Sequence, residues 1–234
     1  MRSQKLDALR GGIILGMIFF HLNYILIHLF GNGVLNFSEL FYFILGRGVA
    51  WLFIFLSGVS FCLSVPRKSL KKIFSSSLRR CLTLSVIALM ITFVTYMYFP
   101  QERIYFGILH FFALASILML IVLPLRGYSI PIGIFIIILG EWIRWIHMDS
   151  IFLIPLGIVP QGFYSADYYP IIPWFGYMLI GYGMTYLFRE RKWFTDLLSG
   201  HTDILTPLAF MGRHSLLIYV VHVPVLYFML KFFL

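Results

Sequence analysis

Long apolar stretches separated by short polar breaks run through nearly the whole of this 234-residue chain. A helix that crosses the hydrocarbon core of a bilayer needs roughly 20 apolar residues. Stretches of about that length cover residues 8–30, 39–65, 78–99, 104–125, 129–147, 169–188 and 213–233. Gly, Pro and Asn residues mark the breaks between them. The pattern predicts an all-α protein, a polytopic transmembrane bundle of about seven helices.

The composition excludes a soluble protein. Apolar residues make up 61% of the chain and charged residues 12%, whereas soluble domains carry roughly 45–50% and about 25%. A chain with so few charges cannot cover its surface in water, so its solvent must be lipid. We expect one membrane domain over residues 1–234. The first apolar stretch is too long for the core of a signal peptide and should remain as the first helix.

The distribution of basic residues predicts the orientation. The net charge is +9, and the Lys and Arg residues cluster in short blocks between apolar stretches. Most fall on the side of the N-terminus, and only Arg47, Arg103, Arg144 and Lys231 fall toward the other side. The positive-inside rule therefore predicts a cytoplasmic N-terminus and an outer C-terminus. This placement also argues against nucleic-acid binding, which a basic chain otherwise suggests.

Two connections are longer than a turn. Residues 148–168 form a predicted outer loop that is rich in Pro, Gly and Tyr and is expected to pack over the bundle. Residues 193–210 mix apolar side chains, such as Trp193, Phe194, Leu197 and Leu198, with polar neighbours, which is typical of an amphipathic stretch at the cytoplasmic membrane surface.

Ionisable side chains inside a membrane are costly and indicate function. Arg10, His21 and His28 all fall on the first predicted helix. At 3.6 residues per turn, His28 aligns with Arg10 and His21 lies about 20° away, so the three share one stripe. His21 lies about 16 Å above Arg10 along the axis. The stripe must face other helices, because facing lipid would be too expensive.

Two more histidines are predicted at a similar depth. His110 lies near the outer end of the helix over 104–125, and His222 lies in the last helix. With His21 they can reach the middle to outer part of one cavity. No pair of them has the spacing of metal ligands on one helix, and no Cys or carboxylate accompanies them, so we expect no metal.

Charged pairs and small residues complete the candidate set. Asp7 lies one turn before Arg10 and can form an ion pair with it at the cytoplasmic mouth, and Glu141 can pair with Arg144 in the same way. Ser57 and Gly58 allow a close approach, either of a neighbouring helix or of a ligand.

Several segments in order resemble one family of membrane enzymes. They are LDALRG at 6–11 followed by His21, FIFLSG at 53–58, GILH at 107–110, DYYP at 167–170 with PWFG at 173–176, and GRHSLLIY at 212–219 followed by His222 and Pro224. The opening motif resembles that of multipass sugar O-acyltransferases. Together the segments resemble the heparan-α-glucosaminide N-acetyltransferase-like family, in particular its bacterial members.

The resemblance implies a membrane acyltransferase. It would move an acetyl group from cytoplasmic acetyl-CoA to a sugar-like or other small-molecule acceptor at the outer face. The basic cytoplasmic side suits the phosphates of CoA. Its candidate CoA-binding residues are Arg79, Arg80, Arg213, Ser57 and Gly58.

The candidate catalytic residues are His21, Asp7 and Arg10, and His110, Asp167, His222 and His28 are candidates on the acceptor side. A neutral imidazole at His21 can act as a general base or can attack the thioester and carry the acetyl group. The sequence leaves both routes open, and also whether His21 or His28 is the key histidine. We prefer His21 for its spacing from Arg10.

Two other functions compete with this one. A small proton-coupled transporter or exporter would use the histidines as proton relays, although no repeat or paired broken helices support it. A non-enzymatic assembly partner would tolerate replacement of the inner histidines. The expected location is a bacterial inner membrane, with lipid as the surrounding partner, and a homo-oligomer is compatible with the sequence.

Overall fold

The described part of the chain is almost entirely helical. A computed structural model describes residues 3–28, 30–31, 39–67, 69–200 and 203–233. Within these ranges the extended pairing is confined to two isolated bridges, Phe106 with Tyr168 and His147 with Val159. Among the described residues, six helical segments are long and apolar enough to cross a membrane. The all-α prediction is confirmed, and the protein is an integral multipass membrane protein.

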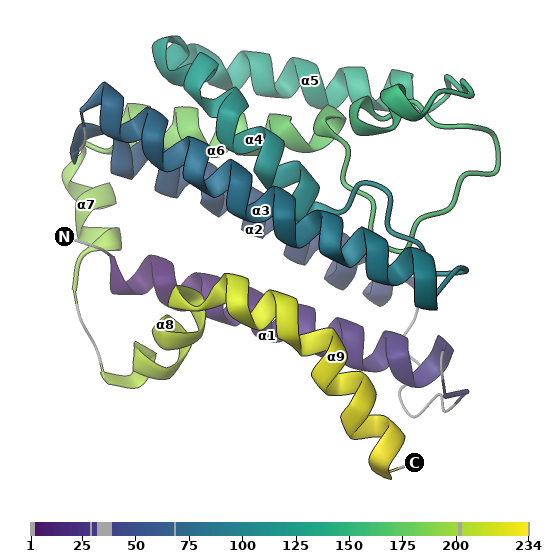
Figure 1. The fold of residues 1–234 in the computed structure, drawn as a ribbon. Helices are drawn as coiled ribbons and strands as arrows, with labels where there is room; N and C mark the ends of the chain where they lie inside the picture. Colours follow the sequence, from purple (N-terminus) through teal and green to yellow (C-terminus); the bar gives the residue numbers. More distant parts are fainter. Residues whose placement is uncertain (1–2, 29, 32–38, 68, 201–202, 234) are drawn as a thin grey trace. The chain divides into compact units, whose positions relative to one another are not determined.

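The described helices are, in order, α1 (Gln4–His28), α2 (Glu39–Ser64), α3 (Leu70–Tyr98), α4 (Ile108–Val122), α5 (Ser129–Ile143), α6 (Ile171–Phe188), α7 (Lys192–Leu198), α8 (Thr206–Arg213) and α9 (Ser215–Phe233) (Figure 1). They divide into two compact units. The first contains Met1–Leu56 and Arg189–Leu234, and the second contains Ser57–Phe188.

The fourth and fifth predicted helices are the two arms of one apolar segment. A candidate span of 36 residues, Ile108–Ile143, contains α4 and α5, which have 15 residues each. A 3-10 turn over Leu123–Tyr128 joins them, and inside it Arg126 leaves the helical region with φ at 51°. The chain reverses at this turn, and α5 then runs beside α6 (Figure 1). The predicted count of about seven thus corresponds to six segments, one of them bent back on itself.

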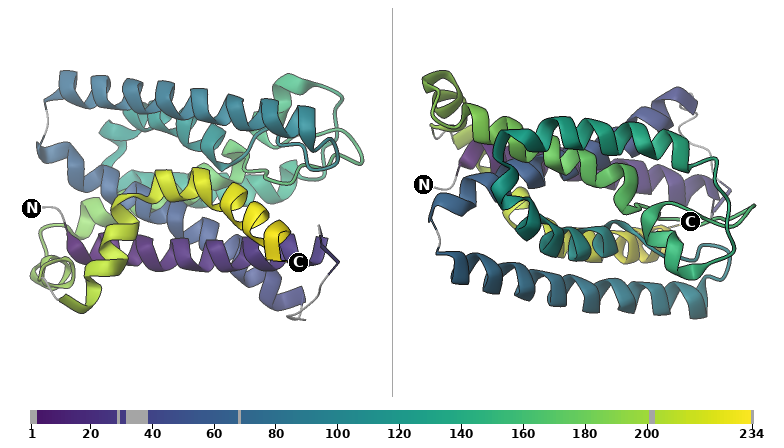
Figure 2. Two further views of the ribbon diagram at one scale, coloured as in Figure 1. Left: turned by 60° about the horizontal axis from the view of Figure 1, so that its bottom comes forward. Right: turned by 90° about the horizontal axis from the view of Figure 1, so that it is seen from above.

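Small residues bring the helices of the second unit close together. Gly133 in α5 lies against the backbone of Gly176 in α6, and a Cβ at either position would meet the carbonyl oxygen of the other. Ser129 Oγ also lies 3.1 Å from the carbonyl oxygen of Leu179, to which it donates. Figure 2 shows α5 and α6 side by side when the molecule is seen from above. In lipid, burying apolar side chains between helices gives little driving force for association, so helices associate through the van der Waals contacts that a close backbone approach allows.

The third helix begins earlier than the sequence analysis predicted. We expected residues 78–99, but α3 begins at Leu70, with Ser69 as its N-cap accepting from the backbone N–H of Lys72 at 3.4 Å. The hydropathy pattern marks where a helix enters lipid, and Lys, Arg and Ser residues continue the helix beyond that point. Arg79 and Arg80 therefore lie within α3, where both are exposed.

In the first unit, α1 packs against α8 and α9. Gly11 faces the backbone of Leu208, and Gly212 faces the carbonyl oxygen of Asp7, so that a Cβ at either glycine would overlap the opposing backbone. Ala209 and Gly212 of α8 are buried. Residues 193–210 were predicted to lie at the membrane surface as an amphipathic stretch. The end of this stretch instead packs on α1, as the start of α8.

Two adjacent glycines of α1 give a matched test of this packing. Ala at Gly11 has to displace the Leu208 backbone, whereas nothing lies within 4 Å of a Cβ at Gly12. We expect Gly11→Ala to lower the free energy of unfolding by about 1–3 kcal/mol, as overpacking does. Gly12→Ala should be neutral or gain up to about 1 kcal/mol of helix propensity. Thermal unfolding of both variants in detergent checks this, and equal effects would contradict the α1–α8 contact.

Candidate active site

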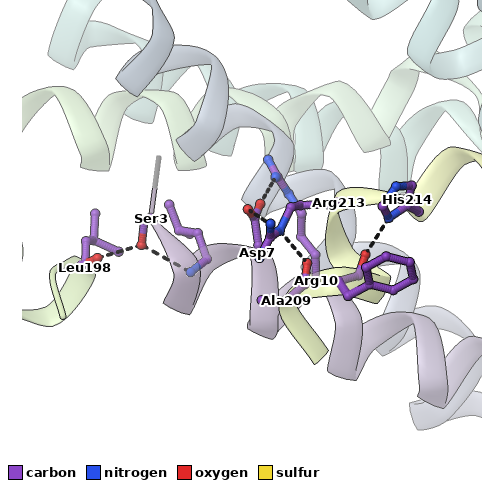
Figure 3. A network of polar contacts seen from close by, with 9 residues as sticks. Ser3, Asp7, Arg10, Leu198, Ala209, Arg213 and His214 are labelled. Carbon is purple, nitrogen blue, oxygen red and sulfur yellow. Dashed lines mark hydrogen bonds and ion pairs between the residues drawn. The ribbon is translucent and has the colours of Figure 1, made fainter. Parts of the chain in front are cut away.

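A buried carboxylate holds the N-terminal end of α1. The side chain of Asp7 is almost completely buried, and its Oδ1 lies 3.1 Å from a guanidinium nitrogen of Arg10. Its Oδ2 lies 4.0 Å from Nε of Arg213 at the end of α8 (Figure 3). The predicted ion pair of Asp7 with Arg10 is confirmed. The sequence analysis did not link Arg213 to this pair, because 206 positions of chain separate it from Asp7.

The two arginines differ in how firmly they are held. The Arg10 side chain is 20% exposed and the Arg213 side chain 44% exposed. Nε of Arg213 also donates to the carbonyl oxygen of Ala209 at 3.3 Å. Removing a carboxylate from water costs several kcal/mol unless a counter-charge accompanies it. Arg10 supplies most of that compensation, and Arg213 keeps much of its guanidinium accessible.

Polar contacts fix the start of α1 against the segment that precedes α9. Ser3 Oγ donates to the carbonyl oxygen of Leu198 at 2.6 Å and accepts from the Leu6 N–H at 3.3 Å (Figure 3). The side-chain amide of Gln4 donates to Thr206 Oγ1 at 3.3 Å. These bonds set the register of α1 relative to α7 and α8.

Deeper in the first unit, two histidines from the ends of the chain meet. Nδ1 of His21 lies 3.3 Å from Nε2 of His222, and the ring centroids are 4.9 Å apart at an angle of 72°. His222 is buried. The sequence analysis placed both histidines toward one cavity, and the structure brings these two together.

The tautomer of His21 follows from its backbone contact. Nδ1 lies 2.9 Å from the carbonyl oxygen of Met17, one turn earlier in α1. A carbonyl oxygen only accepts, so Nδ1 must carry the proton and donate it. In the neutral ring the lone pair is then on Nε2. This nitrogen can take a proton or attack an electrophilic carbon.

The predicted stripe lies on one unbroken helix. Arg10, His21 and His28 are all within α1, which carries the stripe from the Asp7 network to the last residue of the helix. His28 is exposed there, and its ring lies tilted by 35° against that of Tyr24 with centroids 4.3 Å apart. Of the three residues in the stripe, His21, which contacts His222, is the one whose position suits proton transfer or nucleophilic attack.

In the second unit, His110 and Asp167 come together at the start of α4. A carboxylate oxygen of Asp167 accepts from the Ile108 N–H at 3.0 Å. Nδ1 of His110 accepts from the Gly107 N–H at 3.2 Å, and its Nε2 lies 3.3 Å from Thr92 Oγ1. Both nitrogens of His110 are thus engaged in holding the α3–α4 connection. The structure gives these two residues a helix-capping role.

The predicted outer loop is tied to the same end of α4. It contains a 3-10 turn over Ile151–Leu156. Burial raises the pKa of the Tyr168 phenol, so its hydroxyl stays protonated and donates to the carbonyl oxygen of Ile154 at 2.7 Å. The 3-10 turn of the loop packs against α6 of its own unit.

The other candidate residues are spread over the second unit. Arg80 lies over the ring of Phe112, with 5.7 Å from its guanidinium carbon to the ring centroid. Ser57 is buried, and a Cβ at Gly58 would overlap the carbonyl oxygen of Met178. The close approach that these small residues allow is to α6. Glu141 and Arg144 form the predicted ion pair at 2.9 Å. Within the described ranges no three His, Cys, Asp or Glu side chains gather as metal ligands do.

The comparison with known families gives one match. The family model described as heparan-alpha-glucosaminide N-acetyltransferase, catalytic, matches residues 2–224. That range takes in the Asp7 network and both members of the histidine pair. No curated protein and no solved structure gives a significant match.

The Asp7 network predicts a graded response to mutation. Asp7→Asn removes the carboxylate 3.1 Å from the nearly buried Arg10 guanidinium and should cost about 3–5 kcal/mol of unfolding free energy. Arg213→Gln, which removes a half-exposed and more distant partner, should cost about 0–1 kcal/mol. Arg10→Gln should fall between them. Thermal unfolding in detergent measures all three, and an Arg213→Gln effect as large as that of Asp7→Asn would contradict the assignment of Arg10 as the main partner.

Proposed function

Because this chain belongs to the heparan-α-glucosaminide N-acetyltransferase family, we propose that it transfers an acetyl group from cytoplasmic acetyl-CoA to a small acceptor across the membrane. The family membership makes it a membrane acetyltransferase in general terms. The observation that carries the more specific proposal is that α1 holds both His21, with its lone pair on Nε2, and Asp7, whose carboxylate lies beside two arginines. The acceptor would present a hydroxyl or amino group, as a sugar does. The cell membrane of a bacterium is the proposed location.

The donor would dock at the cytoplasmic end of the first unit. CoA carries several phosphate charges, and arginine binds phosphate through paired N–H donors. Arg213 suits this role because its guanidinium is half exposed and only loosely engaged with Asp7. Arg79 and Arg80 are exposed in the first half of α3, and we keep them as candidates for binding CoA phosphates.

The distance along α1 fits the proposal. His21 lies eleven residues beyond Arg10 in an unbroken helix, which corresponds to about 16 Å. Phosphates near Arg213 and a thioester near His21 require a ligand with a long, flexible arm between them. CoA has such an arm, because its pantetheine chain separates the phosphates from the sulfur.

His21 can act by either of two routes. As a general base, Nε2 takes the proton of the acceptor while the acceptor attacks the thioester carbon, and CoA leaves as the thiolate. As a nucleophile, Nε2 attacks that carbon itself, the carbon–sulfur bond breaks and CoA leaves as the thiolate. The acceptor then takes the acetyl group from the ring, which regains its Nε2 lone pair, and the acceptor's proton passes to the thiolate. Both routes need the lone pair on Nε2.

Removing the His21 imidazole should slow acetyl transfer. His21→Ala should lower acetyl transfer by about 10²–10⁴-fold, the usual contribution of a general base. Purified protein in detergent is given acetyl-CoA carrying a labelled acetyl group, with glucosamine as the acceptor probe. Release of CoA, label on glucosamine and label on the protein are measured together. His147→Ala, which changes an exposed histidine outside the site, is the control. Wild-type rates in His21→Ala would remove His21 from the mechanism.

Binding of acetyl-CoA should stabilise the protein through Arg213. Acetyl-CoA at a hundredfold excess over its Kd should stabilise the protein by about 2.7 kcal/mol, which appears as a higher melting temperature in detergent. Arg213→Ala should weaken binding by about 10–100-fold, the value of a hydrogen bond to a charged group. Arg144→Ala, which removes an exposed arginine of the second unit, should bind as the wild type does. If acetyl-CoA stabilises none of these proteins, the transport function is favoured instead.

A further inference from the structure

We propose that His222 is a positioning residue for His21, accepting a hydrogen bond from Nδ1–H of His21 through its own Nε2. This pairing would orient the His21 ring and support the positive charge that forms on it during transfer. The inference rests on the proposed function of His21 as the reacting group. It gives His222 a place beside His21 rather than the place on the acceptor side that the sequence suggested.

The backbone around His222 fixes which nitrogen carries its proton. Nδ1 of His222 lies 2.7 Å from the carbonyl oxygen of Tyr219 and 3.2 Å from that of Ile218. Both oxygens only accept, so Nδ1 must be protonated. In the neutral ring Nε2 then holds a lone pair, and this is the atom 3.3 Å from Nδ1 of His21.

The hydrogen bond between the two rings can therefore run in one direction. Nδ1–H of His21 is shared between the Met17 carbonyl oxygen at 2.9 Å and Nε2 of His222 at 3.3 Å. The reverse bond would require a proton on Nε2 of His222 and a lone pair on Nδ1 of His21. A neutral His222 would then point a lone pair at the Tyr219 oxygen, and His21 would point one at Met17. Two charged rings at this distance would repel each other in a site with little water.

The pairing matters most when His21 becomes positive. Either route places charge on the imidazole once Nε2 has bonded to a proton or to the acetyl carbon. Nδ1–H is then a stronger donor, and two acceptors lie within reach of it. The side chain of His222 is buried, so water cannot simply replace its nitrogen. In acyl-transferring triads a carboxylate holds the base in this manner, and here a neutral imidazole and a backbone carbonyl would share that role.

A spectroscopic test reads the proton positions without any assay of activity. The chain has 7 histidines, which are labelled with ¹⁵N in the purified protein, and the signals of interest are assigned by their loss in His21→Gln and His222→Gln. We expect both rings to show a protonated Nδ1 and an unprotonated Nε2. A proton on Nε2 of His21, or on Nε2 of His222, would overturn the proposal whether or not the protein transfers acetyl groups.

A kinetic test separates positioning from packing. His222→Leu keeps an apolar group of similar volume but removes the acceptor, and should lower kcat by about 10–100-fold, the usual scale for losing an orienting partner. KM for acetyl-CoA should not change, because the donor would be held at the other end of α1. His222→Gln retains an oxygen that can accept, and should recover part of the lost kcat.

The controls make each failure distinct. His147→Gln changes an exposed histidine and should leave kcat as in the wild type. Melting temperatures of the two His222 variants show whether they are folded, and kcat is compared only at temperatures where both are. If the wild type turns over and folded His222→Leu does so equally well, His222 has no positioning role, while His21 keeps its own. If the wild type itself shows no transfer, the proposed function fails, and the proton positions still decide the pairing.

Discussion

Ionisable side chains within a membrane bundle must be compensated inside the protein, and the carboxylate of Asp7 imposes that requirement on the first unit. Asp7 pairs with Arg10 in its own helix and reaches Arg213 at the end of α8. Gly212 packs against the backbone of the same residue. Because α9 begins at Ser215, this attachment also sets where α9 starts. His222 follows two turns later, beside His21. The chemistry proposed for the pair therefore depends on the packing around Asp7.

The described histidines show how one residue type takes different roles. In His110 both nitrogens are engaged at the start of α4, and the ring acts as part of a cap. In His21 a backbone carbonyl oxygen accepts the hydrogen bond of Nδ1–H, so the lone pair of the neutral ring is on Nε2. The proposed difference between the capping histidine and the reacting one is therefore how the second ring nitrogen is used. Sequence position alone does not show this.

The features that arise within one helix could be predicted from the sequence. The lengths of the apolar stretches located the segments, helical spacing paired Asp7 with Arg10 and Glu141 with Arg144, and the stripe of α1 followed from the helical repeat. Contacts between distant segments could not be predicted, because no local signal specifies them. Arg213 beside Asp7 and Asp167 at the start of α4 are of this kind, and for His21 and His222 the sequence predicted a shared cavity but not their direct contact. The early start of α3 was missed because hydropathy marks entry into lipid and not the N-terminus of a helix.

The most direct test of the account is a structure of the protein bound to a non-hydrolysable analogue of acetyl-CoA. The account predicts that the phosphates lie against Arg213 and that the carbonyl carbon of the analogue lies about 3–3.5 Å from Nε2 of His21, the distance of a reactive encounter. An analogue whose acyl end lies away from His21, for instance beside His110, would contradict it.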